Sequence, residues 1–542
     1  MITLQRLVYV LVFFFLKVIP STSQEVSVKF GDVVDVPNMV STYAGCAVTE
    51  SGGYLLNFWE ADFGQNEAKA LVNIYDKNFK LKESKTYQSG LERSTSVALP
   101  YSKGKLGWVV TQRPEGLDSI VCSVATGTVG GEFGKYKTLF SIYSKRSSIL
   151  HTKVQLMVSL DSSKHVIYAI YDKEDLEARP SVNLAVIDDA FNKLWSKRIE
   201  LGYTERRLKA LSWAVLPNGD VCMLAKIYGN DKFAEAIKKD GERVPDYKLV
   251  IFQFSKEADS PKEYELKLGG LFVNGPAIFA NKQNELTCAG FFAKSHTGNS
   301  VGVFNLRLNA IDGNILTMKK HDFDKEDLMQ FGRIYAIQDK DGHLGISSDF
   351  NFSQVQFGEA GRAVLMAEDA SDSVEKQSRI TYEKPSTVNP TGAVNSSTSK
   401  HYYDKNGVAV FQVNAMGDFE SVRLIRKLQS LTTEFFGGFS SLSNEKGLFV
   451  FYNDHEDNLD KGLDDRFKTM GGFSKNTMPV VAIQSPDGEI KRKPLYDIKA
   501  VESLILPTQS FQVNDHQLLI VSMKPEGLLD WNYRLGMITV KD

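Results

Sequence analysis

One acidic segment of the chain has a spacing that could bind a cation. In the run DHEDNLDKGLDD at 454–465, the side chains of Asp454, Glu456, Asn458 and Asp460 alternate as oxygen donors, and Asp465 closes the run. Calcium takes about six to eight oxygen ligands, and this spacing is similar to that of a calcium-binding loop. The segment therefore has two interpretations, a calcium loop or a solvated acidic loop.

Two positions of this segment depart from the pattern of a calcium loop. Leu459 stands where such a loop needs glycine for its sharp turn, and Asp465 stands where a longer glutamate normally supplies two oxygens. These departures favour the solvated loop. We therefore expect no cofactor, and calcium bound by the five oxygen-bearing residues is the alternative.

Common local signatures of catalysis are missing from the sequence. It contains no HExxH, no Walker A and no G-x-G-x-x-G motif, and its eight histidines form no local metal pair. An enzyme that gathers carboxylates from distant segments would leave no such signature. The sequence therefore names no catalytic residue and leaves an enzyme open.

The first residues differ in composition from the rest of the chain. Arg6 precedes the apolar run LVYVLVFFFL, which is followed by Lys17, Pro20 and small residues. This order is typical of a cleavable secretory signal, and the run has about half of the roughly 20 residues that span a bilayer. We expect a signal peptide over residues 1–24, with a membrane anchor as the alternative. The mature chain would then be exported to the periplasm, the cell surface or the medium, with no transmembrane segment.

Charge and cysteine content restrict the partners. Lys and Arg total 64 against 66 Asp and Glu, so the formal net charge is −2 and gives no reason to expect nucleic acid or an anionic membrane as partner. The four cysteines lie in apolar, strand-like runs and share no CxxC spacing. This favours buried thiols over disulfides or a metal site.

Strand-like segments repeat along the rest of the chain. Turn signals that join short apolar runs occur near 51–53, 103–105, 161–164, 218–219, 282–284, 358–361, 444–446 and 514–515. The segment NIYDKNFKL at 73–81 also aligns without gaps to AVIDDAFNK at 185–193. Such a spacing is typical of repeat architectures, and the turns indicate a unit of four antiparallel strands joined by hairpins.

A four-stranded sheet with two apolar faces must cover both, and a ring of such sheets does so without long open edges. We therefore predict an all-β fold, a single β-propeller over residues 25–542 with seven or eight four-stranded antiparallel blades, eight being favoured. The last unit has only three strands, so the segment 25–36 would supply the fourth and close the ring. Two β-sandwiches are the alternative.

Two segments interrupt the repeat. Residues 323–338 place Leu328, Phe331, Ile334 and Tyr335 at helical spacing after an acidic turn, which predicts a short helix between the fifth and sixth units. Residues 384–400 are polar and rich in Ser and Thr. They predict a flexible insertion in the sixth blade at about 371–402.

Three segments carry a resemblance to known proteins: GRAVLMAED at 361–369, NGVAVFQVNAMGDFESVRLIRK at 406–427 and GLFVFYNDHEDN at 447–458. Their strand patterns resemble those of uncharacterised exported β-propeller-like repeat proteins of Bacteroidetes. The resemblance implies a periplasmic or surface location, and it transfers neither an activity nor site residues.

The scaffold and the missing signatures together favour a binding function. We predict an exported, monomeric, non-catalytic propeller that binds a protein or glycan ligand on one face of the ring. The alternative is a carbohydrate-active enzyme, similar to a glycoside hydrolase, with carboxylates gathered at the propeller centre.

Overall fold

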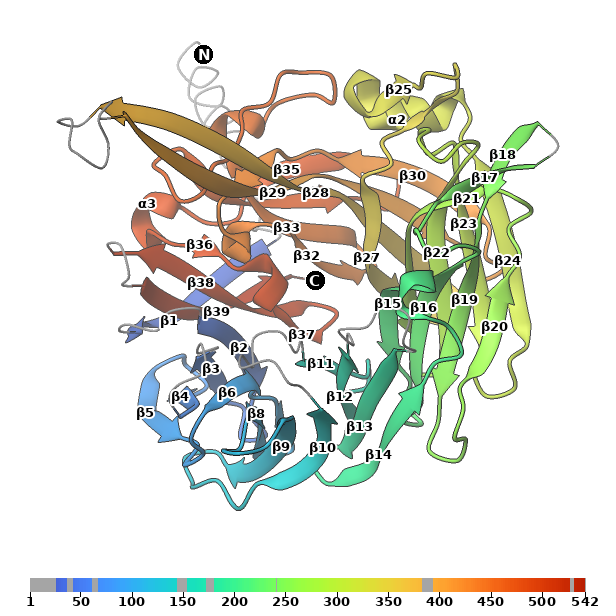
Figure 1. The fold of residues 1–542 in the computed structure, drawn as a ribbon. Coiled ribbons are helices and arrows are strands. Elements are labelled where there is room, and N and C mark those ends of the chain that lie inside the picture. The colour runs from blue at the N-terminus through green and yellow to red at the C-terminus, as the bar shows by residue number, and fades with distance from the viewer. Residues whose placement is uncertain are drawn as a thin grey trace, which may run out of the picture.

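The computed structural model describes residues 26–36, 42–60, 67–143, 154–171, 180–239, 241–382, 393–526 and 531–541. These residues form an eight-bladed β-propeller of antiparallel sheets (Figure 1). The predicted fold and the favoured number of blades are therefore confirmed. Residues 1–24 lie outside the described part of the chain, so the signal peptide stays a prediction.

The first four blades follow one another along the chain (Figure 1). Their strands are β2 (Thr42–Val48), β3 (Tyr54–Glu60), β4 (Lys69–Tyr75) and β5 (Leu81–Gln88); β6 (Ser94–Ala98), β7 (Tyr101–Ser102), β8 (Lys105–Gln112), β9 (Ser119–Thr128) and β10 (Lys137–Tyr143); β11 (Val154–Val158), β12 (Lys164–Tyr171), β13 (Ser181–Asp188) and β14 (Lys193–Glu200); β15 (Leu208–Val215), β16 (Val221–Tyr228), β19 (Tyr247–Phe254) and β20 (Lys262–Leu266). The fourth blade also carries a small hairpin of β17 (Ala236–Lys239) and β18 (Glu242–Pro245).

The last four blades complete the ring. Their strands are β21 (Phe272–Ala280), β22 (Glu285–Ala293), β23 (Gly302–Asn309) and β24 (Ile315–Asp322); β27 (Phe350–Phe357), β28 (Ala363–Tyr382), β29 (Ala393–Val413), β30 (Phe419–Ile425) and β31 (Gln429–Leu431); β32 (Ser440–Asn444), β33 (Gly447–His455), β34 (Thr477–Gln484) and β35 (Ile490–Pro494); β36 (Leu504–Ile505), β37 (Phe511–Asn514), β38 (Gln517–Pro525), β39 (Trp531–Val540) and β1 (Val26–Val36). The connections contain the helices α2 (Lys325–Tyr335) and α3 (Ile498–Val501), a hairpin of β25 (Ala336–Gln338) and β26 (Leu344–Ile346), and the short 3-10 turns η2 (Glu205–Arg207), η3 (Glu359–Gly361), η4 (Glu434–Phe436), η5 (Glu456–Asn458) and η6 (Pro507–Gln509).

The N-terminal strand closes the ring, as predicted. β1 pairs antiparallel with β39, from Val26 opposite Val540 to Val36 opposite Trp531. It thereby becomes the outermost strand of the eighth blade, next to the last strand of the chain. The strands from the two ends of the chain are thus held in one sheet, the eighth blade, and this pairing closes the ring.

Burial explains why the strands appear in the sequence as apolar runs. The middle strands of each blade are covered on both faces by the neighbouring blades, and every residue of β16 is buried. The outermost strands are covered less, and β5 is mostly exposed. Strands with two buried faces become nearly continuous apolar runs, whereas outer strands mix polar and apolar residues.

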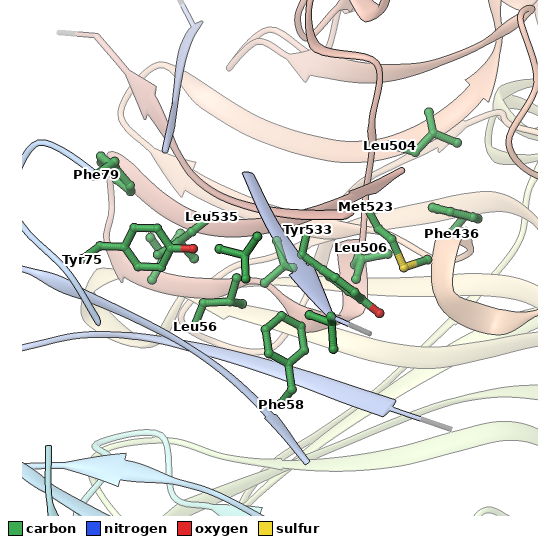
Figure 2. Packing of buried hydrophobic residues seen from close by; sticks show 14 of the residues in the cluster. Leu56, Phe58, Tyr75, Phe79, Phe436, Leu504, Leu506, Met523, Tyr533 and Leu535 are labelled. Carbon is green, nitrogen blue, oxygen red and sulfur yellow. The ribbon is translucent and has the colours of Figure 1, made fainter. Parts of the chain in front are cut away.

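Apolar side chains also join the eighth blade to the first. Figure 2 shows Leu56 and Phe58 of β3 beside Tyr533 and Leu535 of β39. The rings of Phe58 and Tyr533 meet edge to face at a centroid distance of 4.6 Å. Such contacts bury large apolar areas, so the joint between the ends of the chain is packed like the rest of the core.

The turn after the third strand of a blade repeats in detail. In the aligned segments, Asp76 and Asp188 each accept hydrogen bonds from the N–H groups two and four residues later. Phe79 and Phe191 then adopt positive φ angles of 66° and 61°. The carboxylate stabilises the tight turn that this unusual backbone requires, which explains why the sequence alignment keeps both residue types.

The helix predicted over 323–338 is present as α2, capped by Asp324. Its buried side chains include Leu328, Phe331 and Tyr335, whereas Ile334 is half exposed. The helix is interrupted at Gly332, whose φ of 70° only glycine adopts readily, and this break turns Ile334 away from the apolar side.

The insertion in the sixth blade continues β28 and β29 as one long antiparallel hairpin that projects from the ring (Figure 1). Residues 371–382 and 393–402 belong to these two strands, and residues 383–392 lie outside the described part. The flexibility of this insertion stays a prediction.

The four cysteines are free thiols, as the sequence favours. Burial raises the pKa of Cys46 to about 12 and also raises the pKa values of Cys122, Cys222 and Cys288. They serve as small apolar side chains. None of the helices in the described ranges is long and apolar enough to cross a membrane.

Candidate functional site

The residues predicted as calcium ligands begin at the end of β33. Asp454 and Asn458 are buried and bonded to each other, with Asn458 Nδ2 donating to Asp454 Oδ1 at 2.8 Å. Glu456, Asp460 and Asp465 are exposed. Within the described ranges, no three carboxylates of this loop bring their oxygens within 4.8 Å of one another. Calcium binding here stays a prediction from the sequence.

The polar side chains of this loop bond to its own backbone. Asn458 accepts from the N–H of Lys468 and donates to its carbonyl, both at 2.8 Å. Asp465 Oδ2 accepts from the N–H of Gly462 at 2.6 Å. Hydrogen bonds between side chains and the backbone therefore fix the shape of the loop. They leave the main-chain carbonyls of residues 461–465 able to accept hydrogen bonds from outside the loop.

Two arginines bind those carbonyls. Arg426 Nη1 donates to the carbonyls of Leu463 and Asp465 at 2.5 and 2.6 Å, and Arg492 Nη2 donates to the carbonyl of Lys461. Both guanidinium groups lie over the ring of Phe467, at 4.0 and 5.2 Å from its centroid. Burial lowers the pKa of Arg426 and the charge of Arg492 adds to this effect, whereas Tyr335, Asp464 and Asp465 oppose it. Hydrogen bonds and cation–π contacts thus hold two like charges close together.

These arginines line a pocket of about 250 Å³ between the sixth and seventh blades. Its walls come from β30, β35, α2 and the loop after β33, so it lies between the outermost strands of the two blades. The pocket is lined by Gln330, Arg423, Leu424, Arg426, Lys461, Gly462, Leu463, Gly488, Ile490 and Arg492. Four of these ten side chains are cationic and none is acidic.

The cationic side chains of the pocket are not neutralised by ion pairs. In the part of the chain that the structure describes, Arg423, Arg426, Lys461 and Arg492 have no carboxylate oxygen within 4.0 Å. The adjacent acid Asp464 has an oxygen bonded to the N–H of Arg333 at 2.7 Å. The pocket therefore carries an excess of positive charge, although the whole chain is nearly neutral.

A buried ion pair lies next to this pocket along the chain. Lys427, which follows Arg426, is fully buried, and its Nζ lies 2.8 Å from Glu368 Oε1. The same Nζ donates to the carbonyl of Lys405 and to Gln429 Oε1, both at 2.7 Å. Burial lowers the pKa of Lys427, and the charge of Glu368 opposes that effect. The pair fixes the connection that leads out of β30.

Asp454 gives the fold a measurable pH dependence. Burial raises its pKa to about 6. The folded protein therefore keeps a proton that the unfolded chain releases near pH 4, so the free energy of unfolding falls as pH rises from about 4 to 6. An asparagine can accept the same hydrogen bonds without titrating. We expect Asp454→Asn to reduce that fall by about 2 kcal/mol, measured by urea denaturation at pH 4, 5, 6 and 7.

Asp369 provides the internal comparison for this experiment. Its pKa is also raised to about 6, chiefly by burial, and this carboxyl remains in Asp454→Asn. The variant should therefore retain part of the pH dependence. An unchanged profile in Asp454→Asn would contradict the assignment of a raised pKa to this carboxyl.

The strands nearest the propeller axis carry no carboxylates. In several neighbouring blades the first strands contact one another, as β15 does β21 and β21 does β27, which places these strands around the axis. As described, β2, β6, β11, β15, β21, β27, β32, β36 and β37 contain no Asp or Glu, and Lys209 is their one charged residue. The pair of carboxylates that a hydrolase at the propeller centre requires is therefore absent from these strands.

Two further local patterns form no site. Gly298–Gly302 matches the G-x-S-x-G pattern of serine hydrolases, but Ser300 is fully buried and leads into a strand rather than a helix. Asp339, Asp341 and His343 bring their ligand atoms within 4.8 Å of one another. Asp339 accepts from the N–H groups two and four residues later, so this group shapes the turn of the β25–β26 hairpin.

The pocket was not found from the sequence. Its cationic residues come from three segments, around 423–426, at 461 and at 492, each of which resembles an ordinary solvated outer strand or loop. The one available signal is RLIRK at 423–427, where cationic side chains end an outer strand.

Comparisons with known proteins assign the chain to no family. No family model and no curated protein matches the chain. Among solved structures, it is similar to the WD40 domain of SCAP from fission yeast, with 10% identity over 95% of this chain and 98% of that chain and a TM-score of 0.37. It is also similar to the α-L-arabinofuranosidase Arb93A from Fusarium graminearum, with 11% identity over 63% and 92% and a TM-score of 0.29. A protein of unknown function from Dyadobacter fermentans has 12% identity over 63% and 94% and a TM-score of 0.30. Likenesses at this level assign neither an activity nor a ligand.

Proposed function

We propose that the protein is an exported, non-catalytic β-propeller that binds an acidic ligand in the pocket between the sixth and seventh blades. The observation that carries this proposal is the group of four cationic side chains, Arg423, Arg426, Lys461 and Arg492, that line one pocket without an ion pair. Holding like charges together is unfavourable, and an anion between them offsets that cost. Guanidinium groups also match carboxylate and sulfate oxygens in a bidentate manner.

Binding is favoured over hydrolysis by the same arrangement. The first strands, around the axis, lack the paired carboxylates that glycoside hydrolysis uses. None of the three described carboxyls with raised pKa values, Asp220, Asp369 and Asp454, lines the pocket. We therefore place the function in recognition of a ligand, and the propeller serves as a rigid support.

A thermal-shift experiment with small anions tests this proposal. Sulfate or galacturonate that binds the folded protein should raise its Tm, compared with chloride at equal ionic strength. In the double variant Arg423→Gln/Lys461→Gln, we expect less than half of that increase, because each substitution removes a cation from the pocket. The measurement is Tm against anion concentration for both proteins.

The matched control removes one arginine and one lysine charge at positions outside the pocket. Arg466 is exposed in the loop that borders the pocket, and Lys77 is exposed in the first blade. The double variant Arg466→Gln/Lys77→Gln should show the wild-type increase. If both double variants behave alike, or if neither anion stabilises the wild-type protein, the pocket is not the binding site.

A further inference from the structure

We infer that the ligand is an acidic polysaccharide, whose chain lies along the pocket and places anionic groups at both of its ends. This inference rests on the proposed function and adds to it the chemical class of the ligand. It follows from how the cationic side chains are distributed in the pocket, from the donors that they leave free, and from the side chains that are missing from the lining.

The cations form two separate positions. Arg423 is held at one end of the pocket, where its Nε donates to the carbonyl of Gly488 at 3.3 Å. Arg426 and Arg492 are held at the other end, where they bind the carbonyls of residues 461–465. The two positions are thus held by carbonyls of different segments, the turn at Gly488 and the loop at 461–465. A chain with repeated anionic groups can contact both positions at once.

Each position has hydrogen-bond donors to spare. Arg423 uses Nε and Nη1 on carbonyls of the protein and leaves Nη2. Arg426 uses only Nη1 and leaves Nε and Nη2. At Gly488 a side chain would approach Arg423 Nη2 to 3.0 Å, so the glycine keeps that donor accessible. The guanidinium groups are thus oriented by carbonyls and still able to bind carboxylate or sulfate oxygens.

The residues that line the pocket do not favour ligands that bind by stacking on aromatic rings or by adding a strand to a sheet. No aromatic side chain lines the pocket, and both guanidinium groups cover Phe467, so neither a neutral sugar nor a nucleobase finds a ring on which to stack. Extended peptides commonly bind by adding a strand to an open sheet edge. Although two edge strands border this pocket, the groups that converge in it are the cationic side chains of Arg423, Arg426, Lys461 and Arg492. Recognition therefore depends on charge carried at intervals along a chain, which is the chemistry of an acidic polysaccharide.

A length series of oligosaccharides tests this inference with the full chain. Binding of galacturonate monomer, dimer and tetramer is measured by calorimetry, and a series of sulfated oligosaccharides distinguishes sulfate from carboxylate. We expect the tetramer of at least one series to bind at least about tenfold more tightly than its monomer, because the second anion binds without a new loss of translational freedom. Uncharged dextran oligomers of the same length should show no binding.

Substitution of Arg423 tests whether this residue forms a binding position separate from that of Arg426 and Arg492. Arg423→Gln should bind the monomer within about threefold of wild type and lose the gain with length, whereas Arg466→Gln should keep it. The side chain of Lys461 makes no hydrogen bond to the protein in the described ranges, so Lys461→Gln provides a second variant if Arg423→Gln folds poorly. It should weaken every oligomer.

The outcomes separate this inference from the proposed function. Monomer binding that shows no gain with length overturns the polysaccharide and leaves the anion pocket. Equal binding of a glutamate oligomer of matched length also overturns it, in favour of an acidic peptide. If no anion binds at all, both the inference and the proposed function are wrong.

Discussion

Removing Val26–Val36 should open the joint between the eighth and first blades and lower the free energy of unfolding by at least about 5 kcal/mol. The strand β1 is paired with β39 over its whole length and buries Val26, Val34 and Val36. Burial of each valine contributes about 1.5 kcal/mol, and the deletion also leaves the backbone of β39 unpaired. Urea denaturation followed by tryptophan fluorescence measures the loss.

A shorter truncation provides the control for this deletion. A chain that begins at residue 25 keeps β1 and should unfold at the same urea concentration as the full chain. A synthetic peptide of residues 25–36, added to the deleted protein, should restore part of the lost stability. If the deletion leaves the unfolding midpoint unchanged, β1 is dispensable and ring closure does not depend on it.

Replacing Lys427 by methionine should lower the free energy of unfolding by about 3–5 kcal/mol. The substitution leaves the carboxylate of Glu368 buried without its cation, and it also removes the hydrogen bonds to the carbonyl of Lys405 and to Gln429. An uncompensated buried charge is far more costly than the loss of an exposed ion pair. The free energy of unfolding at pH 7 is the quantity to compare.

A double-mutant cycle shows whether the pair acts as a unit. Lys427→Met combined with Glu368→Gln should be less destabilised than the sum of the two single variants, because the double variant leaves no unpaired charge. Lys77→Met, at an exposed position of the first blade, should change the stability by less than about 0.5 kcal/mol. Additive effects of the two single substitutions would show that the Lys427–Glu368 contact is energetically unimportant.

The fold could be predicted because its determinants are local and repeated. Asp76 and Phe79 shape a turn that Asp188 and Phe191 shape again, and the same spacing is visible in the sequence. The last unit had only three strands in the sequence, and the segment before the first unit had the pattern of the strand that it lacked. Ring closure therefore followed from counting strands rather than from any particular contact.

The pocket could not be predicted because it depends on how two blades pack. Arg423 and Arg492 lie on outer strands of different blades, and nothing local in the sequence brings them together. The acidic loop at 454–465 was interpreted through its oxygen donors, yet Asn458 and Asp465 bond to backbone N–H groups. The backbone conformation decides whether a side-chain oxygen accepts a hydrogen bond from its own loop or can bind a cation. The spacing of the side chains along the sequence does not specify that conformation.

The pairing of β1 with β39 also determines when the molecule can finish folding. β1 ends at Val36 and β39 begins at Trp531, so β1 must wait for its partner while the chain between them is made. At about 5–20 residues per second, synthesis of the intervening chain takes roughly half a minute or longer. During that time β1 has no strand partner, and chaperones that cover it would reduce aggregation of the nascent chain.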